Sequence, residues 1–224
     1  MTKALTTSSL LDLTHTMAAP LLEKTVYPWE VLPAIGAFIR ERGEALSPDE
    51  YDTPKPGVWI HKTAKIAPSA FIGDLVIIGP ETEVRHGAFI RGQALVGSGA
   101  VVGNSTELKN VILFDGVQVP HYNYVGDSVL GYKAHLGAGA ITSNVKSDKS
   151  LVTVVMQDMR IPTGLKKCGA MVGDLVEVGC GSVLNPGTVI GRETSVYPLS
   201  MVRGYLPARS IYKKQGEIVQ RRGE

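Results

Sequence analysis

Apolar residues recur at every sixth position through much of the chain. Counting by six from Ile60, each position up to Phe114 is apolar. The series is Ile60, Ile66, Ile72, Ile78, Val84, Ile90, Val96, Val102, Leu108 and Phe114. A helix would repeat about every 3.6 residues, and a half-buried strand would alternate for longer without glycines between its apolar positions. The period of six therefore predicts short strands that turn a corner after each repeat.

A second regular position lies four residues after most of these apolar residues. It holds small or β-branched side chains: Ala70, Val76, Thr82, Ala88, Ala94, Ala100, Thr106 and Ile112. Strand side chains alternate between faces, so this residue and the next aliphatic residue point inward together. The pattern loses one residue near Val119 and Val125, stops near Asn144 and restarts at Val172. Such repeats form a solenoid in which each coil hydrogen-bonds to the coils above and below.

Two segments lie outside the repeat. Residues 28–42 place apolar side chains at helical spacing, with Gly43 as a stop, and we expect this helix to cap the first coil. Residues 145–170 are predicted to leave the stack as a loop or hairpin and return. The predicted organisation has three parts: an N-terminal segment with the helical cap over 1–57, an all-β parallel β-helix over 58–207, and a tail over 208–224.

The composition disfavours several classes of protein. The chain has 224 residues, 20% of them charged, and a formal net charge of +2, so neither nucleic acid nor an acidic membrane is expected as a partner. No apolar stretch approaches the roughly 20 residues that cross a bilayer. Asp12 and His15 interrupt the apolar residues 4–22, which makes them a poor signal sequence. Cys168 and Cys180 are too few for a disulfide framework and are expected to be reduced. The expectation is a soluble, cytoplasmic protein.

Arg91 and Lys109 are the first candidates for chemistry, because they lie three repeats apart and each follows an inward aliphatic residue. Positions with this separation stack on adjacent coils, where like charges repel unless an anion or a carboxylate lies between them. One hypothesis is an anion subsite. The other is that Glu107 or another acid neutralises both cations on a solvated face, and the spacing does not decide between them.

His121 lies beside the register slip, in a run where a histidine and two tyrosines replace the small residues of the repeat. Imidazole has an unperturbed pKa of about 6.5, which suits proton abstraction near neutral pH. A hydrogen-bonded surface histidine is the alternative. His86 and Asn104 occupy the same place in their own repeats. A zinc site is disfavoured, because no other histidine lies within ten positions and the nearest downstream is His135.

Three runs of residues together resemble a known family. They are 103–109 (Gly-Asn-Ser-Thr-Glu-Leu-Lys), 121–127 (His-Tyr-Asn-Tyr-Val-Gly-Asp) and 136–144 (Leu-Gly-Ala-Gly-Ala-Ile-Thr-Ser-Asn). They are similar to the acetyltransferase domain of the bifunctional enzyme that makes UDP-N-acetylglucosamine, and to archaeal sugar-phosphate nucleotidylyltransferase/acetyltransferase proteins. The resemblance covers roughly residues 60–205. It implies the hexapeptide-repeat, left-handed parallel β-helix, and the handedness is taken from the resemblance alone.

The resemblance also implies roles for individual residues. His121 is the implied general base, and Asn144 lies near the acceptor amine. The implied substrate contacts are Arg91, Lys109, Tyr124, His135 and Lys149. The implied coenzyme contacts are Ala138, whose N–H faces the developing oxyanion, together with Cys180 and Lys213. The basic residues toward the C-terminal end are Arg203, Arg209, Lys213, Lys214, Arg221 and Arg222, which either hold coenzyme phosphates or form a solvated run.

The leading hypothesis is therefore a homotrimeric N-acetyltransferase that uses acetyl-CoA on an amino-sugar 1-phosphate and requires no metal. Residues 1–57 contain no Gly-rich phosphate loop, so the family's nucleotidylyltransferase domain is not expected in this chain. Two alternatives stay open. One is a noncatalytic solenoid that binds a sugar phosphate or a partner protein, and the other is a metal enzyme similar to the γ-carbonic anhydrases.

Overall fold

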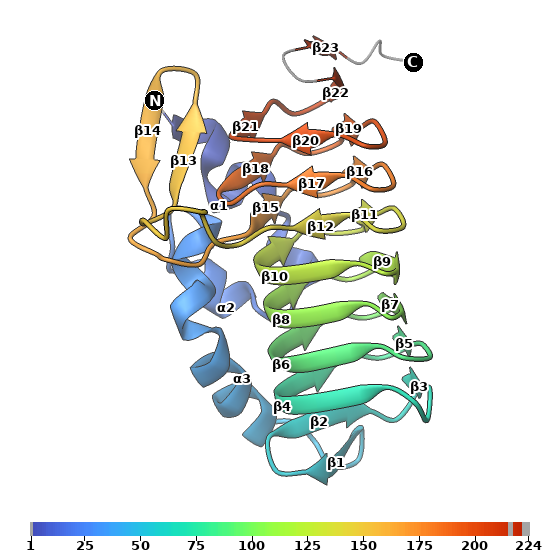
Figure 1. Ribbon diagram of the computed structural model, residues 1–224. Coiled ribbons are helices and arrows are strands. Elements are labelled where there is room, and N and C mark those ends of the chain that lie inside the picture. The colour runs from blue at the N-terminus through green and yellow to red at the C-terminus, as the bar shows by residue number, and fades with distance from the viewer. Residues whose placement is uncertain (1, 215–216, 221–224) are drawn as a thin grey trace.

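The computed structural model describes residues 2–214 and 217–220. The chain winds into a parallel β-solenoid, in which successive coils stack and their strands pair side by side (Figure 1). Val58 pairs with Val76 and Phe71 with Phe89, so each partner lies three repeats further along the chain. The predicted parallel β-helix is therefore confirmed.

Each coil has three faces, named here in chain order. Face 1 consists of β3 (Lys65–Ile66), β5 (Glu83–Val84), β7 (Val101–Asn104), β9 (Gln118–His121), β11 (His135–Leu136), β16 (Glu177–Val178), β19 (Ser195–Val196) and β22 (Ser210–Lys214). Face 2 consists of the first halves of β4 (Phe71–Ile78), β6 (Phe89–Val96), β8 (Glu107–Leu113) and β10 (Tyr124–Leu130), then β12 (Ile141–Thr142), β17 (Val183–Leu184) and β20 (Met201–Val202). Face 3 consists of β2 (Val58–His61), the second halves of β4, β6, β8 and β10, then β15 (Ala170–Val172), β18 (Thr188–Ile190) and β21 (Tyr205–Leu206). Antiparallel strands lie at both ends: β1 (Tyr51–Lys55) beside β2, and β23 (Glu217–Gln220) beside β22.

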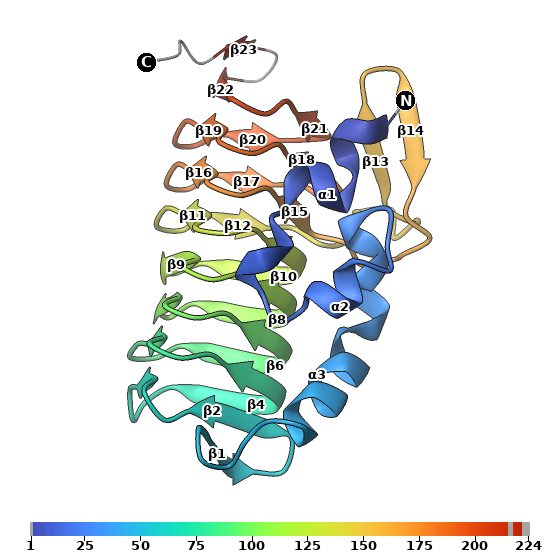
Figure 2. The ribbon, with the colours of Figure 1, turned by 180° about the vertical axis from the view of Figure 1, so that it is seen from behind.

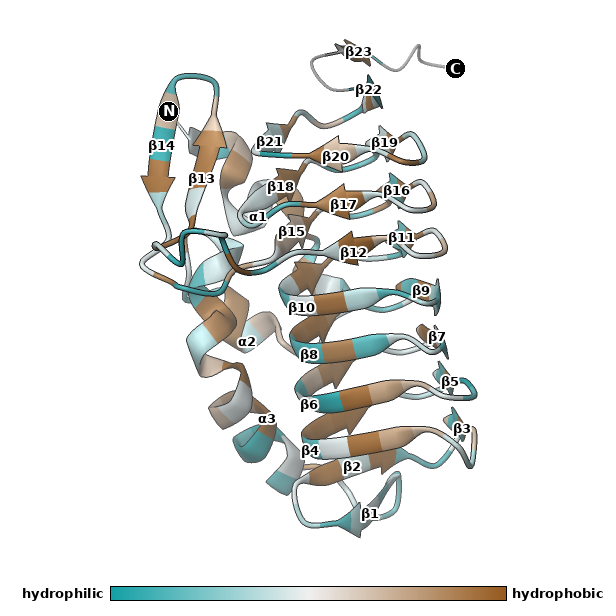
Figure 3. Ribbon diagram, in the orientation of Figure 1, coloured by the Kyte–Doolittle hydropathy of each residue, from teal (hydrophilic) through white to brown (hydrophobic). Residues whose placement is uncertain are grey.

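The predicted inward row forms the core. Val84, Ile90, Val96 and Leu108 are each at most 1% exposed. Hydrophobic residues recur from coil to coil along the strands (Figure 3). Burial of one such aliphatic side chain stabilises the fold by about 1.5–3 kcal/mol, and stacking repeats that gain in every coil.

The one-residue register slip lies earlier than the sequence predicts. Phe89 pairs with Glu107, three full repeats on, but Gly92 pairs with Lys109, which is one position short of three repeats. The irregularity falls at Arg91, between Ile90 and Gly92, and not near Val119. Arg91 and Lys109 are therefore not register partners. The count by six leads from Val96 to Phe114, but the register partner of Val96 is Leu113. Leu113 and Phe114 are both apolar and buried, so apolar spacing alone does not show that the slip has already occurred.

The N-terminal segment covers face 3 (Figure 2). It contains η1 (Thr2–Leu5), α1 (Thr7–Leu10), η2 (Leu13–His15), α2 (Ala19–Leu22), η3 (Pro28–Ala34) and α3 (Ile35–Glu44). Leucines of residues 4–22, such as Leu5, Leu10 and Leu22, are buried in the common core. On face 3 the outward residues Ile77 and Leu95 are as fully buried as the inward ones. The apolar character of residues 4–22 thus serves packing against the solenoid.

The predicted helix is present as η3 and α3, but it does not close the end of the stack. It runs along the flank, where α3 contacts β4, β6 and β8 and η3 contacts β10. The first coil is covered instead by β1, which pairs antiparallel with β2. Gly43 is also not a helix stop. It lies inside α3, and a Cβ there would overlap the Trp59 ring, so its function is close packing.

Asp174 attaches the N-terminal segment to the solenoid. This buried carboxylate accepts hydrogen bonds from the backbone N–H groups of Asp12 and Tyr132, each at 2.8 Å. It also pairs with Arg192 at 3.2 Å. Burial raises the pKa of Asp174, while the two backbone donors and Arg192 oppose that shift. The carboxylate therefore joins the N-terminal segment to two later coils.

The predicted excursion is an antiparallel hairpin of β13 (Thr153–Met156) and β14 (Met159–Pro162). Its base closes where the Cys168 N–H donates to the Asn144 carbonyl at 3.0 Å. The hairpin packs against the last coils at two glycines with positive φ, Gly187 and Gly204. A Cβ on Gly204 would lie 2.6 Å from a carbonyl oxygen of β13, so only glycine fits there. The excursion thus leaves the stack after Asn144 and rejoins it at Cys168.

No helix in the described part of the chain is long and apolar enough to cross a membrane. Of the basic tail residues, Arg221 and Arg222 lie outside the described residues.

Candidate active site

The edge where face 1 turns into face 2 carries several of the predicted site residues. We name this line the His121 edge: His86, Asn104, His121, Ala138, Cys180 and Pro198, one residue per coil. Each of the first five carbonyls accepts a backbone hydrogen bond from the next coil, at 2.8–3.3 Å. The proposed base, His121, is therefore followed directly by Ala138 and Cys180, two of the three residues expected against the coenzyme. His86 and Asn104 lie on the same line, as the repeat predicts.

His121 combines a fixed backbone with an accessible side chain. Its backbone N–H donates to Oδ1 of Asn123 at 3.1 Å. Nδ2 of Asn123 donates to the carbonyls of Gly137 and Ala140 in the next coil, at 2.8 and 3.0 Å. Asn123 is only 2% exposed, whereas His121 is exposed and its ring forms no hydrogen bond to any described residue. The imidazole is thus available to a ligand.

Ala138 lies in the turn between β11 and β12. The N–H groups on either side are used: Gly137 donates to Val178 at 2.7 Å and Gly139 donates to His121 at 2.9 Å. The N–H of Ala138 donates to no acceptor in the described part of the chain, and the residue is exposed. An exposed, unused N–H is a suitable hydrogen-bond donor to an oxyanion.

A polar cluster lies at the other end of face 2, around Asp127. We name it the Asp127 cluster: Lys109, Asn110, Tyr124, Asp127 and Asn144. Asp127 accepts from Lys109 Nζ at 3.2 and 3.3 Å, from Asn110 Nδ2 at 2.9 Å and from Asn144 Nδ2 at 2.5 Å. Asn144 Nδ2 also donates to the Tyr124 hydroxyl at 3.1 Å. The structure thus joins Lys109, Tyr124 and Asn144 in one network, and Asp127, which sequence reasoning missed, is its centre.

The two candidate anion-binding cations each have a carboxylate partner. Arg91 Nη1 pairs with Glu107 Oε1 at 2.9 Å, and Lys109 pairs with Asp127. In the free protein the acids therefore neutralise both cations, as the second sequence hypothesis states. The Arg91 side chain remains 46% exposed, so its guanidinium is still accessible to a ligand.

Gly126 leaves the space that the Tyr124 side chain needs. A Cβ on Gly126 would lie 2.5 Å from the Tyr124 hydroxyl and 2.9 Å from Asn144 Nδ2. The tyrosine ring and the amide therefore occupy the space that glycine leaves. Partial burial raises the pKa of Tyr124, so its hydroxyl stays protonated at neutral pH.

Tyr124 is the member of the Asp127 cluster that lies nearest to His121 in the chain. It begins β10 three residues after His121 ends β9, and its hydroxyl accepts a hydrogen bond from Asn144. No hydrogen bond between described residues links His121 to the cluster.

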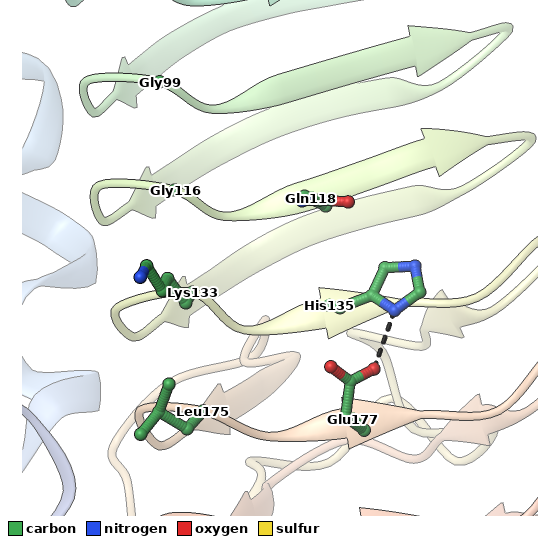
Figure 4. Close-up of a pocket in the computed structure, with 7 residues that line it drawn as sticks. All are labelled: Gly99, Gly116, Gln118, Lys133, His135, Leu175 and Glu177. Atoms are coloured by element: carbon green, nitrogen blue, oxygen red, sulfur yellow. Dashed lines mark hydrogen bonds and ion pairs between the residues drawn. The ribbon is translucent and has the colours of Figure 1, made fainter.

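His135 is placed apart from both groups. It lies at the start of β11 on face 1, where Nδ1 pairs with Glu177 Oε2 at 2.7 Å (Figure 4). The two side chains line a shallow pocket together with Gly99, Gly116, Gln118, Lys133 and Leu175. Among the described residues, His135 therefore forms no hydrogen bond to the other residues predicted to contact the substrate.

Lys149 and Lys213 are also separate from the cluster. Lys149 is exposed in the loop that leads into the hairpin, where its N–H donates to the Lys146 carbonyl at 2.9 Å. Lys213 is exposed in β22, one residue after Tyr212, which pairs with Val196 on the neighbouring coil. The exposed residues Tyr197 and Leu199 flank Pro198 of the His121 edge. Their coil lies between the coil of Cys180 and the coil of Lys213.

The two cysteines differ sharply in accessibility. Cys180 is exposed, whereas Cys168 is buried. Burial raises the pKa of the Cys168 thiol to about 12. We expect iodoacetamide at pH 8 to alkylate Cys180 and to leave Cys168 unmodified until the protein unfolds.

The same alkylation experiment tests the coenzyme contact. If coenzyme A lies along the His121 edge, saturating desulfo-coenzyme A should slow alkylation of Cys180 by at least about tenfold, as peptide mass spectrometry measures. Equal rates with and without the coenzyme analogue would place the coenzyme elsewhere.

No group of three or more His, Cys, Asp or Glu side chains within residues 2–214 and 217–220 is arranged to hold a metal ion.

Comparison with known proteins identifies relatives of the chain. The chain matches no protein-family profile. It is 32% identical over 154 residues to the bifunctional protein GlmU of Methanococcus vannielii, which covers 68% of this chain and 34% of that protein. It is 32% identical over 148 residues to the bifunctional sugar-1-phosphate nucleotidylyltransferase/acetyltransferase of Sulfurisphaera tokodaii, covering 66% of this chain and 37% of that protein. The chain thus spans about a third of the length of these curated relatives.

Among solved structures, a hexapeptide transferase family protein from Anaplasma phagocytophilum is similar, with a TM-score of 0.43 and 18% identity over 75% of this chain and 82% of that one. The period of six residues, the stacked parallel coils and the identity to the GlmU proteins concern the same part of the sequence. The chain is a member of the hexapeptide-repeat β-solenoid family and a homologue of the GlmU-type bifunctional acetyltransferases.

Proposed function

We propose that the chain transfers the acetyl group of acetyl-CoA to the amine of an amino-sugar 1-phosphate. The observation that carries the proposal is the His121 edge, where an exposed imidazole with no partner among the described residues precedes the unused N–H of Ala138. The relatives of the chain include a protein named for both sugar-1-phosphate nucleotidylyl transfer and acetyl transfer. The chain spans only about a third of the length of these relatives.

The chemistry follows from these positions. The neutral acceptor amine attacks the thioester carbonyl, and the Ala138 N–H stabilises the oxyanion that forms. His121 takes the proton that the amine loses. The carbon–sulfur bond then breaks, and the protonated imidazole returns the proton to the departing thiolate. No step requires a metal ion or a covalent enzyme intermediate.

Arg91 and Lys109 supply the acceptor phosphate contacts in this proposal. Arg91→Ala and Lys109→Ala should each raise the KM of the phosphorylated acceptor about ten- to hundredfold and that of the unphosphorylated sugar far less, because each removes a charge-assisted hydrogen bond. Arg85→Ala is the matched control, since Arg85 forms an ion pair of the same 2.9 Å length with Glu83 on face 1. Steady-state rates of thiol release with both acceptors measure the effect. Equal losses on the two acceptors would exclude phosphate binding.

We further propose that three copies associate and form the site between neighbours. Two observations support this assembly: no hydrogen bond between described residues links the His121 ring to the Asp127 cluster in one chain, and face 2 exposes the ring pair Phe71 and Phe89. Three flat faces per coil suit cyclic packing. Light scattering should give a mass of about three times 23.9 kDa. A monomer that retains full activity at all concentrations would refute the shared site.

A further inference from the structure

Asp127 is one of only two carboxylates that the fold buries among the described residues, the other being Asp174. The Asp127 side chain is 5% exposed, and its backbone has a φ of +48°, at the corner where face 2 turns into face 3. Its two oxygens receive hydrogen bonds from three side chains: Lys109, Asn110 and Asn144. An ionised carboxylate only accepts hydrogen bonds. Every group that faces it must therefore present a donor.

This requirement fixes the orientation of the Asn144 amide. The nitrogen of an Asn side chain has two hydrogens, and both are used here: one toward Asp127 Oδ2 and one toward the Tyr124 hydroxyl. The amide oxygen, Oδ1, is consequently directed away from Asp127. It accepts no hydrogen bond from the described residues.

The same network sets the orientation of the Tyr124 hydroxyl. Its oxygen accepts from Asn144 Nδ2, which leaves the phenolic hydrogen without an acceptor among the described residues. Tyr124 can therefore donate that hydrogen to a ligand. The network thus presents one acceptor, Asn144 Oδ1, and one donor, the Tyr124 hydroxyl, on the same patch of face 2.

We infer that Asp127 is a positioning residue that sets the polarity of the acceptor site: it keeps Asn144 Oδ1 available to accept from the substrate amine and the Tyr124 hydroxyl available to donate to a substrate oxygen. The inference rests on the proposed acetyl transfer to an amino sugar. On this inference the acceptor site prefers an amine, which donates hydrogen bonds, because Asp127 orients Asn144. Asp127 itself does not touch the substrate.

The test compares Asp127→Asn with the matched control Asp74→Asn. The Asn side chain has nearly the same shape as Asp but presents a donor, so the Asn144 amide must turn over and offer its nitrogen to the substrate. Asp74 lies near the corresponding corner of an earlier coil, with its side chain 84% exposed and paired with Lys55. Calorimetry without acetyl-CoA measures binding of an amino-sugar 1-phosphate and of its analogue with fluorine in place of the amine.

Wild type and Asp74→Asn should bind the amine about tenfold more tightly than the fluoro analogue, which is the effect of one hydrogen bond. Asp127→Asn should lose this preference with its melting temperature lowered by no more than a few degrees. The exchange Asp127→Asn/Asn144→Asp restores an outward acceptor and should restore the preference. Its recovery would exclude a merely structural role, which the exchange would not repair.

An unchanged preference in Asp127→Asn would overturn the inference, as would equal weakening of both ligands or a wild type that binds neither. A wild type that prefers the amine in this experiment but never consumes acetyl-CoA would refute the proposed transfer while leaving the role of Asp127 supported. Binding and turnover thus separate the two failures.

Discussion

His121→Ala should lower the turnover number by about 10² to 10⁴ and leave the affinity for acetyl-CoA nearly unchanged. A positioned general base contributes an effect of this size, and its removal affects the chemical step more than binding. The His121 ring makes no hydrogen bond to the described residues and its backbone is held by Asn123, so the substitution should not alter the fold. Steady-state kinetics and coenzyme calorimetry measure the two quantities.

His86→Ala is the matched control for this substitution. His86 lies on the same edge two coils earlier, is exposed, and contacts Ser69 through Nδ1 at 2.6 Å. It should retain full activity. Normal turnover in His121→Ala, or the same loss in both variants, would refute the assignment of the base.

Gly126→Ala should lower kcat/KM for the phosphorylated amino sugar by about ten- to hundredfold. The added Cβ would lie within 3 Å of the Tyr124 hydroxyl and of Asn144 Nδ2, so both groups must move. A displacement of about 1 Å in a substrate-positioning group is sufficient for a loss of about 10². The loss should appear with the amino-sugar phosphate and leave coenzyme binding unchanged.

Gly36→Ala is the control for an added methyl group. Gly36 lies in α3 away from the site, and the three atoms nearest to a Cβ there belong to the flexible Gln93 side chain, at 3.2–3.3 Å. This variant should keep its activity, and melting temperatures of both variants check the fold. Full activity in Gly126→Ala would mean that neither Tyr124 nor Asn144 contacts the substrate.

The inner rows of the solenoid were predictable from sequence because each follows from a single rule of spacing. The covered face was missed for a different reason. On face 3 the triplets 76–78 and 111–113 are apolar at all three positions, whereas a face open to solvent would alternate. That unbroken run is the signal that another layer covers this face, and residues 4–22 provide part of the layer.

The site was predicted only in part. The resemblance predicted Lys109, Tyr124 and Asn144 as site residues, and these three share one hydrogen-bond network in the structure. Asp127 was not predicted as a site residue, because its partners come from the preceding coil (Lys109 and Asn110) and from Asn144, where the excursion begins. Its signal was a carboxylate directly after Gly126, at a corner where the preceding coil has Asn110.

Asn123 was missed although it breaks the repeat. It occupies the inward position that holds Thr106 in the coil before and Ala140 in the coil after. An amide at such a place requires buried hydrogen-bond partners, which it finds in the turn of the next coil. The partners themselves depend on coil stacking, which the sequence pattern of one coil does not specify.

Direct detection of the product tests the central proposal most closely. The purified chain is incubated with acetyl-CoA and a panel of amino-sugar 1-phosphates, and mass spectrometry follows both the sugar phosphate and free coenzyme A. We predict that one amino-sugar 1-phosphate gains a single acetyl group with release of one coenzyme A per product, and that His121→Ala forms this product at least about a hundredfold more slowly. Binding of the sugar phosphates without any acetylated product would contradict the enzyme and favour a noncatalytic sugar-phosphate-binding solenoid.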